Sequence, residues 1–480
     1  MPRLPCSLVL LALLVGRCLG GAPEGELIDR VWSGHPVSFA LLTEAGHQFI
    51  AYYDAGRHLT VVGRKLGETT WARVQPPGGP SAHGHDSNVT GWDSHNYLRL
   101  ALDRDGGLHL SGNMHVDPLV YYRTRVPLDV TTLERVDRMT GEREARCTYP
   151  VFFKNTAGDL LFRYRDGSSG NGSDLYNAYD PAAHAWHRLL ATPLLDGQGQ
   201  RNAYALDPVL GPDGWFHLVW MWRESPDCAT NHTLSYARSR DFIHWENSRG
   251  EPLVLPVTLA TGEVIDAAKP GEGLINMTFN LGFDAQQRPV VVYHRYDAAQ
   301  HSQAYVARPI GAALAAARSA AEIPGRRQAA PLQNNSPATG WDVHQLSDWK
   351  FTWAFSGGGS IPADVTLGAP HLMPDGNLRM DFTTRDAGAG RWTVDPATLV
   401  CTATLPPAEA VLPAALLQAT TAGMEVQTVV AHANGRRWVL RWETLPRNRD
   451  LPREAAPPPT ELRLYELPDT DAASAARVGS

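Results

Sequence analysis

Short apolar strand patterns recur along the chain, each directly after a turn signal. The runs after the turns alternate or are rich in β-branched and aromatic residues, as in Val290–His294 and Trp438–Trp442. Seven such units occur, with turns at Glu44–Gly46, Asp105–Gly106, Ala157–Gly158, Asp213–Gly214, Ala285–Gln287, Asp375–Gly376 and Ala433–Gly435. Repetition of similar β-rich units is typical of radial folds. The pattern predicts an all-β, single-domain, seven-bladed β-propeller.

The two ends of the chain depart from this repeat. A basic residue precedes the apolar run Leu8–Val15, and small residues follow, which is typical of a secretory signal peptide over residues 1–22. The run is too short to cross a bilayer, and no later run of ~18 apolar residues follows it. We therefore expect the propeller over residues 23–468, a flexible tail over 469–480, no membrane partner, and a secreted or periplasmic location.

Charge and cysteine content narrow the class of partner. The formal net charge is −7, which argues against nucleic acid as a partner. An anionic polysaccharide is compatible with it, because a local cluster of Arg and His can oppose the global charge. After the signal peptide only Cys147, Cys228 and Cys401 remain, too few for a disulfide framework. We expect a monomer held together by its core.

Polar residues flank two of the predicted turns at matched distances. His95 and His115 lie about equally far from the turn at 103–107, so antiparallel pairing brings both imidazoles to one end of a hairpin. Tyr204 and Arg223 flank Asp213–Gly214 in the same way. Histidine titrates near neutral pH, so the pair could transfer protons.

A third hairpin repeats the arrangement with Tyr149 and Arg165 around Ala157–Gly158. If the blades stack alike, all six side chains converge on one face of the propeller. The alternative is that each is an ordinary polar residue at a strand end. The six together favour a single composite site over this alternative.

These residues lie in segments that resemble a known group, the BNR-repeat secreted propellers. That group includes propeller-type ulvan lyases, rhamnose–glucuronate lyases and some α-L-rhamnosidases. The resemblance covers roughly residues 27–465 and rests on Asp93–Tyr97, Leu102–His115, Thr148–Phe153, Phe162–Gly172, Trp220–Glu224, Asn231–His232, Tyr236–Asp241 and Tyr293–His294.

The resemblance implies a propeller that cleaves a uronate-containing polysaccharide by β-elimination. In the lyases of the group, a His, or a His with a Tyr, is base and acid, and an Arg offsets the uronate carboxylate. The matching histidines are His95 and His115, the matching Tyr is Tyr204, and the Arg is Arg223 or Arg165. The group also implies a structural zinc or calcium ion in some members.

The residue types suit this reaction, which needs a base, a cation for the carboxylate and an acid for the leaving oxygen. Imidazole or tyrosinate can be the base, and the planar Arg fork binds carboxylate in two places. We therefore predict His95, His115, Tyr204 and Arg223 as catalytic, with no cofactor required for the chemistry. The predicted substrate-binding residues are Arg165, Tyr149, His294 and Trp222, although Trp222 could equally serve packing between blades.

Other interpretations remain open at this point. An α-L-rhamnosidase-type hydrolase would need two opposed carboxylates, and no spacing singles out such a pair. A non-catalytic carbohydrate-binding propeller would repeat similar residues in each blade, whereas the polar ends here differ. Cys228 and His232 could contribute to a zinc site if a further His joined them; the alternative is a buried thiol beside a loop histidine.

Overall fold

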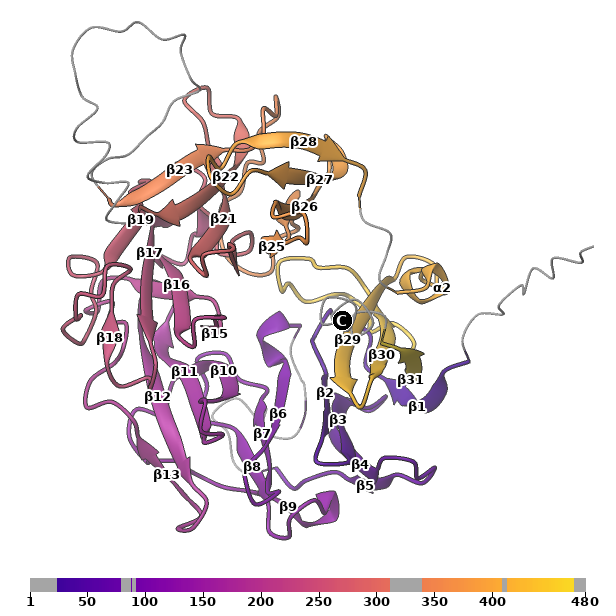
Figure 1. Cartoon of the computed structure of the whole chain (residues 1–480). Helices are drawn as coiled ribbons and strands as arrows, with labels where there is room; N and C mark the ends of the chain where they lie inside the picture. The colour runs from indigo at the N-terminus through magenta and orange to yellow at the C-terminus, as the bar shows by residue number, and fades with distance from the viewer. Residues whose placement is uncertain (1–23, 79–87, 89–91, 311–338, 408–411, 470–480) are drawn as a thin grey trace, which may run out of the picture.

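A computed structural model describes residues 24–78, 88, 92–310, 339–407 and 412–469 of the chain. The predicted signal peptide and all but the first residue of the predicted tail lie outside these ranges. In the described part, the strands form seven antiparallel sheets of four to six strands, and each predicted turn falls in a different sheet. Figure 1 shows the sheets following one another around the molecule in chain order. The prediction of an all-β propeller is confirmed.

The first three sheets along the chain each have four strands. They contain β2 (Ala40–Glu44), β3 (His47–Tyr53), β4 (Leu59–Lys65) and β5 (Ala72–Val74); β6 (Leu98–Leu102), β7 (Leu108–Gly112), β8 (Tyr121–Thr124) and β9 (Leu133–Arg135); and β10 (Cys147–Lys154), β11 (Leu160–Ser168), β12 (Asn171–Asp180) and β13 (Ala185–Arg188). Two short 3₁₀ helices, η1 (Ser94–Asn96) and η2 (Val130–Thr132), lie between these strands.

Two of the next three sheets have additional short strands. They contain β14 (Asn202–Ala205), β15 (Val209–Leu210), β16 (Phe216–Arg223), β17 (Asn231–Ser239), β18 (Trp245–Glu246) and β19 (Glu263–Asp266); β20 (Asn280–Phe283), β21 (Pro289–Tyr296), β22 (Ser302–Pro309) and β23 (Trp341–Gln345); and β24 (Val365–Leu367), β25 (His371–Leu372), β26 (Leu378–Thr384), β27 (Gly388–Val394) and β28 (Cys401–Leu405). The 3₁₀ helix η3 (Cys228–Thr230) precedes β17.

The last sheet joins the two ends of the described chain. It contains β1 (Glu26–Val31), β29 (Glu425–Ala433), β30 (Arg436–Thr444) and β31 (Thr460–Pro468), with the short helix α2 (Ala414–Leu417) just before β29. β1 pairs with β31, from Glu26 opposite Leu464 to Val31 opposite Thr460. The indigo and yellow strands therefore lie side by side in Figure 1, and the ring of sheets is closed by strand pairing.

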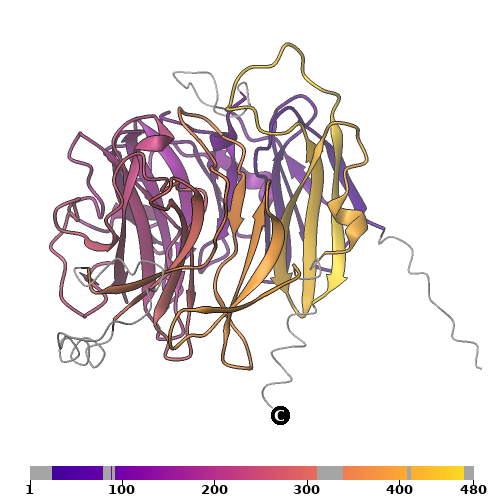
Figure 2. The same cartoon turned by 90° about the horizontal axis from the view of Figure 1, so that it is seen from above.

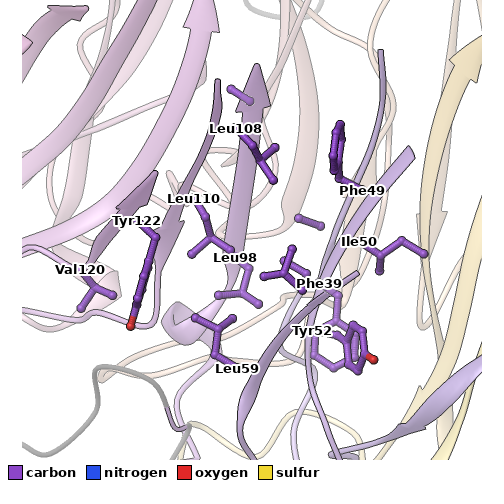
Figure 3. Packing of buried hydrophobic residues seen from close by; sticks show 14 of the residues in the cluster. Phe39, Phe49, Ile50, Tyr52, Leu59, Leu98, Leu108, Leu110, Val120 and Tyr122 are labelled. Atoms are coloured by element: carbon purple, nitrogen blue, oxygen red, sulfur yellow. The ribbon is translucent and has the colours of Figure 1, made fainter. Parts of the chain in front are cut away.

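The sheets pack face to face, so side chains on both faces of strands such as β16 and β22 are buried. Leu98, Leu108 and Leu110 of one sheet pack near Phe49 and Ile50 of the preceding one, as Figure 3 shows. Figure 2 shows the same sheets seen after a quarter turn, with their strands running roughly along one direction. Polar side chains buried inside the strands, such as His109 and His217, are hydrogen-bonded. No helix in the described part of the chain is both long and apolar enough to cross a membrane.

Two of the sheets each contain a buried hydrogen-bonded chain of an Asp, a His and a Tyr. An Asp from the hairpin turn binds a strand His at 3.1 Å, and that His binds a Tyr of the next strand at 2.6–2.7 Å. The members are Asp103–His109–Tyr121 and Asp213–His217–Tyr236. Burial lowers the pKa of both histidines, so they are neutral structural links near pH 7.

The register places the predicted site residues at the sheet ends away from the hairpin turns. Leu98 pairs with Gly112, so the segment before β6 and the segment after β7 leave the sheet together. In the same way Thr148 pairs with Arg165, and Asn202 pairs with Arg223.

Candidate active site

The two predicted histidines meet on a shared carboxylate. Asp93 Oδ1 lies 2.6 Å from His95 Nδ1, and Asp93 Oδ2 lies 2.5 Å from His115 Nδ1. The two imidazole rings stack with their centroids 3.9 Å apart. Asp93 also caps η1 by accepting the backbone N–H of His95, which fixes the turn that carries this histidine. The prediction that His95 and His115 lie together is confirmed, and Asp93 is the residue that holds them.

The shared carboxylate fixes the protonation of both rings. Burial raises the pKa of Asp93, but hydrogen bonds from His115 and His95 outweigh it and lower that pKa well below its usual range. Asp93 is therefore ionised and can only accept, so each Nδ1 carries a proton. Burial lowers the pKa of His95 despite the opposing effect of Asp93. A neutral His95 then has its lone pair on Nε2.

Tyr149 extends this group toward the neighbouring sheet. Its hydroxyl lies 3.0 Å from His95 Nε2 and donates to that lone pair. The residue sits in a β-bulge between Thr148 and Val151 with a φ of 59°, a left-handed conformation that is costly for Tyr. The bulge lets its ring leave the regular strand alternation. Burial raises the pKa of Tyr149 well above its usual value, so it stays protonated.

Tyr204 has the opposite electrostatic environment. Its hydroxyl lies 3.0 Å from Arg223 Nη1 and 2.7 Å from Ser169 Oγ. Burial raises the pKa of Tyr204, but the charges of Arg223 and Arg165 outweigh it, and the net shift is downward. Arg223 also lies over the Tyr204 ring at 4.8 Å, and its Nε has no hydrogen-bond partner within the described residues. Tyr204 is thus the more acidic of the two tyrosines.

These side chains share one cavity of about 440 Å³. Its charged lining is basic, with Arg99, Arg223 and Arg447 beside the two histidines, and no Asp or Glu is among its described lining residues. The net charge of −7 therefore coexists with a cationic cavity, as an anionic ligand requires. Arg99 and Arg447 were not predicted from the sequence, because neither belongs to a pair placed symmetrically about a turn.

Three predicted substrate-binding residues do not line this cavity. Arg165 is 2% exposed. Its guanidinium carbon lies over the Tyr149 ring, 4.9 Å from the ring centroid. Trp222 and His294 are fully buried, Trp222 in a core cluster and His294 against Gly273 O at 2.7 Å. The prediction that these three contact sugar conflicts with their burial, because both faces of each sheet are covered by a neighbour. Tyr149 does line the cavity, as predicted.

The residues considered for metal binding have other partners. His232 Nε2 lies 2.7 Å from Glu224 and Nδ1 lies 2.9 Å from Thr233 Oγ1. Cys228 is buried at the cavity wall. A zinc site built on these two therefore stays a prediction.

Asp93, His95 and His115 are the group of three potential ligands found in the described residues. Two ligands at ~2.0 Å in a tetrahedral zinc site lie about 3.3 Å apart. The Asp–His separations of 2.5 and 2.6 Å are shorter and fit hydrogen bonds instead. As they stand, the three residues do not fit a metal ion, and no catalytic step is assigned to one.

A known protein family matches the part of the chain that carries these site residues. The sequence model of the BNR repeat-containing family matches residues 47–314, which include the histidine pair and both Tyr–Arg pairs. The chain belongs to this family. Among curated proteins it is similar to the long isoform of an ulvan lyase from Alteromonas sp, with 28% identity over 137 residues. That match covers 27% of this chain and 14% of the relative. An ulvan lyase from Pseudoalteromonas sp. (strain PLSV) is 26% identical over 148 residues, 28% of this chain and 15% of the relative.

Two solved structures resemble the whole fold. The polysaccharide lyase Uly1 superimposes with a TM-score of 0.58 over 94% of both chains, at 14% identity. An ulvan lyase of the polysaccharide lyase family PL25 gives a TM-score of 0.56 over 93% of this chain and 96% of that one, at 13% identity. Identities this low show a common fold.

Proposed function

We propose that the protein is a polysaccharide lyase that cleaves a uronate-containing polysaccharide by β-elimination. The observation that carries the proposal is the cationic cavity that two imidazoles on one carboxylate line together with a Tyr–Arg pair. The similar ulvan lyases support the substrate class, since one of them was solved with a bound glucuronate–rhamnose sulfate disaccharide.

The geometry supports a division of roles. His115 is the more exposed imidazole, at 33% against 18% for His95, and its Nε2 has no hydrogen-bond partner within the described part of the chain. With Nδ1–H bound to Asp93, that Nε2 takes the proton from C5 of the uronate. His95, bonded to Tyr149, supports this base from the adjacent ring.

Arg223 and Tyr204, which line the same cavity, complete the reaction. Arg223 binds the uronate carboxylate, so the charge that develops there on loss of the C5 proton is stabilised before the reaction begins. Tyr204, acidified by two arginines, donates its proton to the C4 oxygen as the C4–O bond breaks. The products are an unsaturated uronate and a free sugar hydroxyl, and His115 and Tyr204 then exchange their protons with solvent.

The same cavity argues against hydrolysis. A retaining or inverting glycosidase generally uses two carboxyl groups on opposite sides of the bond that breaks. The described lining residues of this cavity include none, and both oxygens of Asp93 are bonded to histidines. An adjoining cavity that shares Tyr149 and Tyr204 is lined by Asp174 and Asp207, and both of these carboxylates lie against Arg163. An α-L-rhamnosidase activity therefore has less support than elimination.

The test is an assay of purified protein on a panel of uronate-containing polysaccharides, monitored by the ultraviolet absorption of the unsaturated product. We expect absorbance to rise with at least one substrate, and His115→Ala to slow it by ~10²–10⁴-fold, the usual contribution of a general base. The exposed His371, in β25, provides the control His371→Ala, which should retain full activity. Chain cleavage without absorbance would favour hydrolysis, and binding without cleavage would favour a lectin.

A further inference from the structure

One carboxylate outside the predicted chemistry ties three distant segments to the edge of the cavity. Asp450 lies on the connection between β30 and β31, and its Oδ1 accepts Nε2–H of His35 at 2.8 Å and the hydroxyl of Ser360 at 2.7 Å. The same oxygen accepts the backbone N–H of Ser94 at 3.1 Å, and Oδ2 accepts the N–H of Ser360 at 2.9 Å. Ser94 directly precedes His95 in η1.

The segment that contains Ser360 forms part of the cavity wall. We call residues 356–361 the rim loop; four of them line the cavity. At its first end, Gly357 N–H donates to Asp227 Oδ1 at 2.6 Å and Gly357 O accepts from Cys228 N at 2.8 Å. Asp227 and Cys228 follow β16, the strand that ends at Arg223. The rim loop therefore runs from the Arg223 side of the cavity to Asp450, which also holds the turn of His95.

The backbone around Asp450 is held in a costly conformation. Arg449 and Asp450 have φ angles of 65° and 59°, both left-handed for residues other than glycine. Arg449 donates to Ser356 O at 2.8 Å and to Ser360 O at 3.1 Å. Gly359 packs so closely that a Cβ atom there would lie 2.2 Å from Arg449 O. Such strain persists where surrounding contacts fix it, which indicates that this junction is built to hold one geometry.

We infer that Asp450 is a positioning residue of the active site, which fixes the distance between the Asp93–His95–His115 group and Arg223 through the rim loop. The inference rests on the proposed function for its catalytic consequence. A base and a carboxylate clamp must meet the same uronate residue, so an error of ~1 Å between them costs up to ~10²-fold in rate. Asp450 forms no hydrogen bond with His115, His95 or Tyr204; apart from the effect of its charge on His95, it acts through Ser94 and the rim loop.

The test combines kinetics with hydrogen exchange on Asp450→Ala in the full chain. We expect kcat to fall by about tenfold to a hundredfold, with a smaller change in KM. We also expect faster amide exchange in peptides covering 92–97 and 356–361, and unchanged exchange in β6 and β16. Ser360→Ala removes one of the four bonds and should give the same pattern more weakly, which keeps the test usable if Asp450→Ala folds poorly.

A matched control lies on β30, the strand that precedes the loop carrying Asp450. Glu443 is buried and accepts hydrogen bonds from Thr420, Thr421 and Arg441, away from the cavity lining. Glu443→Gln should lower the melting temperature without changing kcat. Equal kcat in Asp450→Ala and Glu443→Gln, or unchanged exchange in either segment, would overturn the inference. Wild-type protein inactive on every uronate polymer would instead overturn the proposed function, and with it the catalytic part of this inference.

Discussion

Replacing Asp93 with Asn tests the protonation pattern on which the base depends. An amide keeps the size of the carboxylate but offers one acceptor oxygen and one donor NH₂ group, where Asp93 offers two acceptors. Only one of His95 and His115 can then keep its Nδ1–H bond. The other ring must turn its Nδ1 lone pair to the amide and carry its proton on Nε2, where it cannot accept a proton from the substrate.

The size of the effect follows from the role that is lost. Both imidazoles now bond the carboxylate at 2.5–2.6 Å, so neither can adapt without breaking a short hydrogen bond. If His115 is the ring that changes tautomer, the full contribution of a general base, ~10²–10⁴-fold, is removed. This corresponds to about 3–5 kcal/mol of transition-state stabilisation. If His95 changes instead, the bond that it accepts from Tyr149 is lost and the decrease is smaller.

The assay is the initial rate of absorbance increase on the best uronate substrate, with Asp213→Asn as the matched control. Asp213 also pairs with a buried histidine, His217, but in a structural chain at the opposite end of its sheet. The control should lose stability and keep its turnover number. A turnover number for Asp93→Asn within about twofold of wild type would refute the assignment of the histidine pair.

Three further variants follow from the same structure. Tyr204→Phe should lower kcat by ~10²-fold or more with little change in melting temperature, because it removes the proton donor and keeps the ring; near-normal kcat would leave proton donation to Tyr149. Arg223→Lys should lower kcat/KM by about tenfold or more, because an ammonium group cannot bind carboxylate in two places, whereas Arg125→Lys at an exposed site should have no effect. Burial lowers the pKa of His294 to about 4, below the ~6.5 of an unfolded chain. Its stabilising contribution is therefore present above pH ~6.5 and is lost as pH falls toward ~4, by up to about 3 kcal/mol. Urea unfolding across this range should show a smaller loss in His294→Gln, and equal slopes for the two proteins would contradict the assignment.

The convergence of the site could be predicted from sequence because antiparallel pairing conserves distance from a turn. His95 and His115 lie about equally far from one hairpin turn, and the register of Leu98 with Gly112 brings them to the same sheet end. The two Tyr–Arg pairs follow the same rule. Where a predicted contact depended only on strand register, the structure agrees with it.

Exposure could not be predicted in the same way. Alternation along β16 places Trp222 and Arg223 on opposite faces, but in a propeller both faces of a sheet are covered by neighbours. Nearness to a strand end is therefore not enough to reach the cavity: Trp222 directly precedes Arg223 at the end of β16, yet it packs into a core cluster, and His294 is fully buried too. Asp450 and the rim loop were missed because they lie in loops, whose paths no periodic pattern specifies.

The most direct measurement of the central claim is the mass of the oligosaccharides released from a uronate-containing polysaccharide in ¹⁸O-labelled water. Elimination predicts a new non-reducing end that lacks the elements of water, absorbs ultraviolet light and carries no ¹⁸O from the cleavage step. A saturated product that gains one labelled water at each cleavage would contradict the account, because it would require a hydrolytic mechanism in place of the proposed proton transfers by His115 and Tyr204.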